Sequence, residues 1–233
     1  RLVGSEMCIR DRYQGNIGNK FHADGSVRSF AGNTVISFID HADPIFALFC
    51  RVRSMLQATS AGDCFTYLPD DSIHMTVFEG VCDQWRDASL WTHFLPVDCP
   101  LTEVDKLFEQ RFRLAPVWKE VYMHAVGIKT DGGYGIALEP ASAEDASRLR
   151  TYRDALRELL GIEFPGHDTY RYHISICYGV KSPTAAQETA LDRFEKDAEH
   201  VIAQSNVTFR VNAPHLTYFR NMFGFDTARF ARS

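Results

Sequence analysis

At residues 170–179 the chain runs Tyr170-Arg171-Tyr172-His173-Ile174-Ser175-Ile176-Cys177-Tyr178-Gly179, a pattern typical of a buried β-strand that carries one polar pair. Successive side chains on a strand point to opposite faces. His173 and Ser175 are therefore expected on one face, and Ile174 and Ile176 on the other. The alternation predicts an imidazole and a hydroxyl that point together into one cavity.

The same pattern occurs a second time, at Ile73-His74-Met75-Thr76-Val77-Phe78. Here alternation places His74 and Thr76 on one face, and the two His-x-Thr/Ser motifs lie 99 residues apart. A single histidine on a strand is most often a core residue satisfied by one hydrogen bond. Two copies among apolar neighbours favour a shared function, because two such pairs could hold one phosphate from both sides: an imidazole exchanges protons, and a hydroxyl donates a hydrogen bond to a phosphate oxygen.

Paired His-x-Thr/Ser strands resemble the signature of the 2H phosphoesterases, which include LigT-like RNA cyclic phosphodiesterases and plant cyclic nucleotide phosphodiesterases. Residues 15–40, 67–83 and 170–179 are similar to three recurrent blocks of a subgroup catalogued as a domain of unknown function. The HMTVFEGV segment, which begins at His74, separates this subgroup from general LigT relatives. The resemblance implies an α+β, bilobal fold, in which two pseudo-symmetric β-α-β-β-type halves with antiparallel sheets surround a central cleft.

The chemistry of a cyclic phosphodiester assigns roles to these residues. Hydrolysis needs a base for the attacking water, an acid for the leaving ribose oxygen, and donors for the charge on the non-bridging oxygens. Histidine titrates near neutral pH, so one neutral and one protonated imidazole can coexist. Thr76 and Ser175 would bind the phosphate. The resemblance implies His173 as the base and His74 as the acid, and we expect neither a metal nor another cofactor.

Other residues near the motifs are candidates for substrate binding. Strict alternation places Arg171 on the His173 face, where its guanidinium could reach the phosphate; pairing with a carboxylate is the alternative. Tyr172 and Tyr178 flank the second motif. Alternation also places Phe78 on the His74 face, as the floor of a base pocket or as a core residue, and turns Glu79 away.

Three further patterns leave alternatives open. His215-Leu216-Thr217 is a formal third His-x-Thr motif that periodicity alone does not exclude. Trp85 or Trp91 could stack on a base at the mouth of the cavity, or both could belong to a packed connector. His167 and Asp168 could form a metal site with His173, although this set lacks a fourth ligand.

Composition limits the class of partner. The 233 residues carry a net charge of −5, which gives no basic surface for long nucleic acid. A small nucleotide or a short RNA end fits this charge better than an extended duplex.

The sequence contains no run of 18 apolar residues, so no membrane span is predicted. The six cysteines show neither CxxC nor metal-finger spacing, which favours free thiols in a reducing, cytoplasmic compartment. Nothing in the sequence indicates an oligomeric state.

The boundaries of the domain and its elements follow from turn and capping signals. Residues 1–12 look like translated read-through of a sequencing adapter, so the natural start is expected downstream, and residues 13–233 are expected to form one bilobal domain. An arm or hairpin is predicted at 13–32, with a turn at Asp24-Gly25. Helices are predicted at 43–60, 101–114, 139–160 and 182–203, the second starting with a capping-box-like sequence at 102–105. Strands are predicted at 33–40, 64–68, around His74, 121–129, 134–138, 170–179, 207–211, 215–219 and 223–225.

These observations predict a metal-independent phosphodiesterase that hydrolyses a cyclic phosphodiester: a 2′,3′-cyclic nucleotide, an RNA end or a related cyclic nucleotide. The alternative is a binding module that uses the same cleft to sense or sequester a nucleotide without turnover.

Overall fold

A computed structural model describes residues 16–229 of the chain. The predicted adapter-derived segment and Cys8 lie outside the described residues. Four α-helices are present in the described range: α2 (Pro44–Gln57), α3 (Leu101–Phe112), α4 (Ala143–Leu160) and α5 (Ala185–Ser205). The strands are β1 (Gly32–Phe38), β2 (Phe65–Tyr67), β3 (His74–Cys82), β4 (Val121–Lys129), β5 (Gly133–Pro140), β6 (Tyr172–Gly179), β7 (Thr208–Val211), β8 (His215–Asn221) and β9 (Gly224–Asp226). No helix of this range is both long and apolar enough to cross a membrane.

The strands form one antiparallel sheet in the order β7-β4-β5-β6-β3-β1-β8-β9, and β2 pairs with β6. The sheet has two halves that meet at its centre, where β3 and β6 are joined by a single pair, Met75 with Ile174. Both histidine motifs therefore lie on the two central strands. The α+β fold with antiparallel halves around a cleft is the predicted fold class, and it is confirmed.

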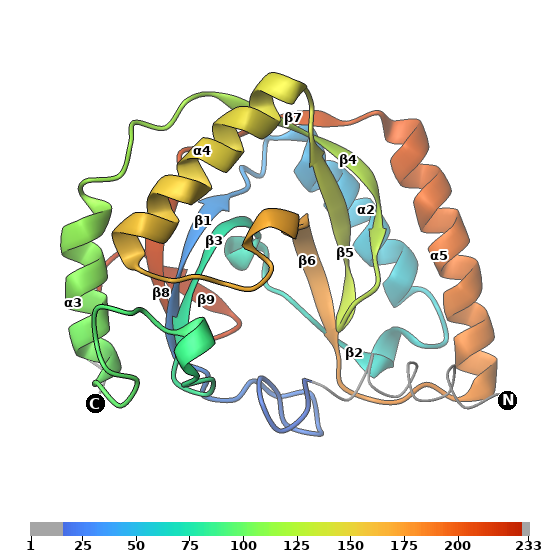
Figure 1. The fold of residues 1–233 in the computed structure, drawn as a ribbon. Helices are drawn as coiled ribbons and strands as arrows, with labels where there is room; N and C mark the ends of the chain where they lie inside the picture. The colour runs from blue at the N-terminus through green and yellow to red at the C-terminus, as the bar shows by residue number, and fades with distance from the viewer. Residues whose placement is uncertain (1–15, 230–233) are drawn as a thin grey trace, which may run out of the picture.

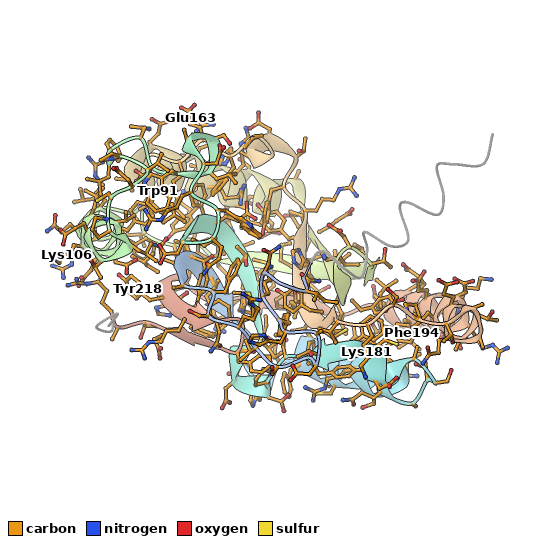
Figure 2. The ribbon with its side chains drawn as sticks, turned by 90° about the horizontal axis from the view of Figure 1, so that it is seen from below. Trp91, Lys106, Glu163, Lys181, Phe194 and Tyr218 are labelled. Atoms are coloured by element: carbon orange, nitrogen blue, oxygen red, sulfur yellow. The ribbon has the colours of Figure 1, made fainter. Side chains whose placement is uncertain are left out.

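The helices cover the two halves in pairs. Helices α2 and α5 pack against each other and against β7 and β4, respectively, whereas α3 and α4 pack together and contact β8 and β3. Figure 1 shows the two pairs on opposite sides of the central strands. In the view from below, Trp91 and Lys106 lie over one half, and Lys181 and Phe194 over the other (Figure 2).

The two halves are interleaved in sequence. Strand β1 belongs to the half of β3 and β8, yet α2, which follows it in the chain, packs against β7, and β2 pairs with β6 in the other half. Strand β1 lies between β3 and β8, so the C-terminal part of the described chain completes the half that the N-terminal part begins. The halves are thus not two consecutive segments, and each depends on the other for a full set of strands.

Side chains cap three of the four helices in the described range, although the helices predicted from 139 and 182 begin later, at Ala143 and Ala185. Asp43 accepts from the backbone of Ile45 at the start of α2, and Ser142 caps α4 in the same way. Helix α5 has a full capping box between Thr184 and Gln187. The capping box predicted at 102–105 is wrong, because α3 begins at Leu101 after Pro100, without a side-chain cap.

The segment from residue 16 to 31 is an ordered arm, as predicted, with Gly25 at a φ of 84° in its turn. Phe21 is fully buried and packs against the rings of Tyr178 and Phe223. The Asn16 side chain donates to the carbonyl of Gly132, in the turn between β4 and β5. The arm therefore fastens one wall of the central cavity to both β6 and the β4–β5 turn.

Candidate active site

The two motifs face one cavity of about 600 Å³, which His74, Thr76, His173 and Ser175 all line. The pair Met75–Ile174 fixes the antiparallel register of the central strands. Continued by one residue in each direction, this register sets His74 opposite Ser175 and Thr76 opposite His173. Each histidine thus lies across from the hydroxyl of the other motif. The apolar residues between them, Met75 and Ile174, are fully buried on the other face.

The two imidazoles are held in the same way. His74 Nδ1 lies 2.6 Å from the carbonyl oxygen of Ser72, and His173 Nδ1 lies 3.2 Å from that of Arg171. In both cases the acceptor belongs to the residue two positions before the histidine. A carbonyl only accepts, so Nδ1 carries the hydrogen in each ring, and Nε2 of the neutral ring keeps its lone pair. This tautomer suits a general base.

Burial lowers the pKa of both histidines to about 4. The surroundings differ, however. For His173 the second largest cause is the positive charge of Lys129, with smaller contributions from His74 and Lys20. For His74 only burial lowers the pKa, and its hydrogen bond to Ser72 opposes that change. Protonation is therefore opposed by neighbouring cations at His173 alone.

A β-bulge follows the first motif and changes which residues face the cavity. In the pairing of β3 with β1, Thr76 lies opposite Ile36 but Phe78 lies opposite Val35, so Val77 is the extra residue. Its carbonyl accepts a 2.6 Å hydrogen bond from the buried Arg153. The bulge reverses the alternation beyond Thr76.

Two side-chain orientations that strict alternation predicted on this strand are therefore wrong, whereas the alternative of Phe78 as a core residue is confirmed. Phe78 is fully buried and packs against the rings of Phe164 and His167, and it is not among the residues that line the cavity. It is a core residue rather than the floor of a base pocket. Glu79, which strict alternation turned away from His74, lines the cavity instead.

A second bulge follows the second motif at the corresponding position. Against β5, Ser175 pairs with Gly135 and Cys177 with Tyr134, so Ile176 is the extra residue. Its carbonyl accepts from the backbone of Leu68, next to β2. Tyr178 consequently faces the cavity, in agreement with its place among the candidate substrate-binding residues.

The other two candidates beside this motif lie outside the cavity lining. Arg171 precedes β6, so strand alternation does not extend to it, and its exposed side chain leaves only its backbone carbonyl in contact with His173. Tyr172 lies on the face opposite His173 and packs edge-on against the ring of Tyr170. Neither side chain is placed to bind a substrate in the cavity.

Sequence reasoning missed several cavity residues. Tyr170 lines the cavity, as Thr76 does. Lys129 comes from the end of β4 and Lys20 from the arm, and both side chains line the same cavity. Neither lysine belongs to a motif, and only the tertiary fold brings the two to His173. Burial lowers the pKa of Lys129, and the charge of Lys20 lowers it further.

The structure separates the alternatives that the sequence left open. His215 is exposed, whereas Thr217 is fully buried and donates to the carbonyl of Thr34, so the third His-x-Thr motif does not line the cavity. Trp85 is 46% exposed and lines the cavity, but Trp91 is buried and donates to the carbonyl of Pro96.

The residues weighed as a metal site have other partners. His167 Nε2 lies 2.7 Å from Asp154, and Asp168 pairs with Arg150. Within residues 16–229 no group of three or more histidine, cysteine, aspartate or glutamate side chains is arranged to hold a metal ion. The five cysteines of this range are free thiols, and Cys64, Cys82 and Cys177 are buried.

Paired His-x-Thr/Ser strands at the centre of an antiparallel sheet are the arrangement that the resemblance to the 2H phosphoesterases implied. Residues 20–132, just under half of the chain, match the family model 2H-phosphodiest, described as a domain of unknown function (DUF1868). The match is consistent with a 2H phosphoesterase superfamily member, and its range contains the first His-x-Thr motif but not the second motif at His173. This match supports a phosphoesterase-type function.

A solved structure shares the fold over nearly the whole chain. This conserved protein of unknown function from Agrobacterium tumefaciens superposes with a TM-score of 0.84 and 24% identity, over 93% of this chain and 92% of its own. A protein of Thermus thermophilus gives a TM-score of 0.44 and 14% identity, over 80% of this chain and 87% of its own. None of the curated proteins matches the sequence.

Proposed function

We propose that this chain hydrolyses a cyclic phosphodiester, as in a 2′,3′-cyclic nucleotide or an RNA end, with His74 and His173 as acid and base. One observation carries the proposal: the central register brings two His-x-Thr/Ser motifs to one cavity face, each histidine with Nδ1 fixed and Nε2 available. Thr76 and Ser175, one from each strand, would donate to the non-bridging oxygens.

The unequal surroundings of the histidines support a division of roles. Lys129 opposes protonation of His173, which favours a neutral imidazole that takes the proton from the attacking water. A bound phosphate is negatively charged and raises the pKa of both rings. His74, whose pKa no neighbouring cation lowers, would then be the ring that holds a proton and gives it to the leaving ribose oxygen. The water oxygen forms a bond to phosphorus as the bond to the ribose oxygen breaks.

The test is turnover of the four 2′,3′-cyclic nucleoside monophosphates in EDTA by wild type, His74→Gln and His173→Gln. Loss of a general acid or base costs about 10²- to 10⁴-fold in rate, so each variant should fall in that range. His215→Gln is the matched control, because it alters a histidine of the same motif outside the cavity, and it should keep wild-type turnover. Full activity in either cavity variant would refute the two-histidine mechanism. Nucleotide binding without turnover would favour the sensing module.

A further inference from the structure

Glu79 is a carboxylate that the proposed reaction does not use. The bulge at Val77 turns it into the cavity, on the same strand as His74 and Thr76 and roughly 7–10 Å beyond Thr76 along β3. Its side chain is exposed to the cavity, and no hydrogen bond or ion pair to its carboxylate is found among residues 16–229. The fold thus presents an unpaired acceptor next to the place where the phosphate would bind.

A carboxylate in this position disfavours anionic ligand groups and favours groups that donate hydrogen bonds. It repels an anion, so it does not serve the phosphate, and when ionised it only accepts hydrogen bonds. Desolvation in the cavity raises the pKa of Glu79, and the positive charges of Arg153 and Lys20 oppose this rise. A ligand group with N–H or O–H donors would supply the missing hydrogen bonds. We therefore expect Glu79 to face a hydrogen-bond donor group of the ligand.

Aromatic rings stand at the same end of the cavity. We call Phe30, Trp85 and Tyr178 the aromatic wall; all three line the cavity, and Phe30 and Trp85 meet edge to face at 5.2 Å. The Lys20 ammonium lies 4.8 Å from the ring centre of Tyr178 and 5.7 Å from that of Trp85. The same ammonium is close enough to Glu79 to lower the pKa of its carboxyl. Glu79 therefore lies near the rings of Trp85 and Tyr178, on which a flat ligand could stack, while the buried ring of Phe30 supports Trp85 from behind.

The chemistry of the proposed substrate narrows the choice of donor. In a 2′,3′-cyclic nucleotide both of these ribose hydroxyls are esterified, so the hydrogen-bond donors are on the base and at the 5′ end. Guanine presents two adjacent donors, N1–H and the N2 amino group, which match the two oxygens of one carboxylate. Adenine and cytosine present one amino group beside an unprotonated ring nitrogen. Uracil presents a single N–H between two carbonyl oxygens.

We propose that Glu79 and the aromatic wall form a base subsite that selects guanine, a proposal that rests on the function proposed above. The base stacks on the wall and donates two hydrogen bonds to the Glu79 carboxylate. A bidentate contact to a base edge discriminates by roughly 5- to 150-fold. Wild type should therefore have a kcat/KM at least fivefold higher for the guanosine substrate than for the uridine substrate. Glu79→Gln should remove most of this preference, because an amide offers only one acceptor oxygen.

The experiment compares kcat/KM for the four 2′,3′-cyclic nucleotides in wild type, Glu79→Gln and Glu163→Gln, together with equilibrium binding of GMP and UMP. Glu163 is an exposed carboxylate at the edge of the molecule and should leave the profile unchanged (Figure 2). A guanine preference lost only in Glu79→Gln supports the subsite. Equal use of all four bases by wild type, or an equal loss for all four in Glu79→Gln, overturns it while leaving the hydrolase intact.

The binding arm separates failure of the subsite from failure of the proposed function. If wild type turns over none of the four nucleotides, the hydrolase proposal fails on these substrates. GMP binding that exceeds UMP binding, with the difference lost in Glu79→Gln, would still support base selection. GMP and UMP binding of equal strength would overturn it.

Discussion

Acidification should destabilise the fold through the two cavity histidines. Burial lowers the pKa of His74 and His173 from 6.5 to about 4, whereas the unfolded chain returns each to its ordinary value. Between pH 6.5 and pH 4 the unfolded state therefore binds more protons, and the free energy of unfolding falls as the pH falls. The difference corresponds to at most about 3 kcal/mol for each histidine. Water in the cavity reduces this value, since both rings line it.

Urea unfolding followed by circular dichroism between pH 7 and pH 4 measures this loss directly. Wild type should be most stable above pH 6.5 and weaken steeply below it. His74→Gln and His173→Gln should each remove about half of the histidine-dependent slope, and the double variant most of it. His215→Gln, which changes an exposed histidine, should unfold like wild type. A double variant with the wild-type pH dependence would show that the cavity does not hold these imidazoles neutral.

Two further variants test how neighbours tune and position the motifs. Lys129→Met removes a positive charge beside His173 and should therefore raise the pKa of His173. Imidazole titration followed by NMR should show His173 titrating at higher pH while His74 is unchanged. An equal change in both histidines would contradict the difference assigned to their surroundings. Arg153→Met removes the donor to the Val77 carbonyl and should lower the free energy of unfolding, measured by urea titration, by about 1–3 kcal/mol. It should also lower kcat in the turnover assay. A stable variant with normal kcat would exclude a positioning role for Arg153.

Local patterns were sufficient to predict most elements and the motif pairs. The helix start predicted at Asp43 is confirmed, whereas the helix predicted from 139 begins only at Ala143, after β5. Period-two alternation placed His74 with Thr76 and His173 with Ser175. Local patterns were not sufficient to predict which strands pair with each other in the sheet. Pairing of β2 with β6 depends on tertiary packing between segments more than 100 residues apart, for which the sequence has no local signal. The same limit hid Lys20, because tertiary contacts of the arm, among them those with β6 and the β4–β5 turn, bring it to the cavity.

The incorrect side-chain orientations on β3 have one physical cause. Strict alternation predicted that Phe78 faces the cavity and Glu79 does not, and one extra residue in the strand reverses both. In both bulges of the central strands, another group bonds the carbonyl of the extra residue. For Val77 that group is Arg153 on α4, and for Ile176 it is the backbone of Leu68 next to β2. Both partners are remote in sequence, so the bulges could not be predicted from the strand residues alone.

The two bulges also show how the site is duplicated. Each follows the hydroxyl residue of its motif, and each brings the residue five positions after the histidine into the cavity: Glu79 in the first motif and Tyr178 in the second. The histidine and hydroxyl positions therefore repeat with like chemistry, and the fifth position repeats in geometry but differs in chemistry. Equivalent residues around one phosphate would make the cavity nearly symmetric. The difference at the fifth position breaks that symmetry. If the proposed function holds, a carboxylate on one side and a ring on the other would give an asymmetric nucleotide one preferred orientation between the histidines.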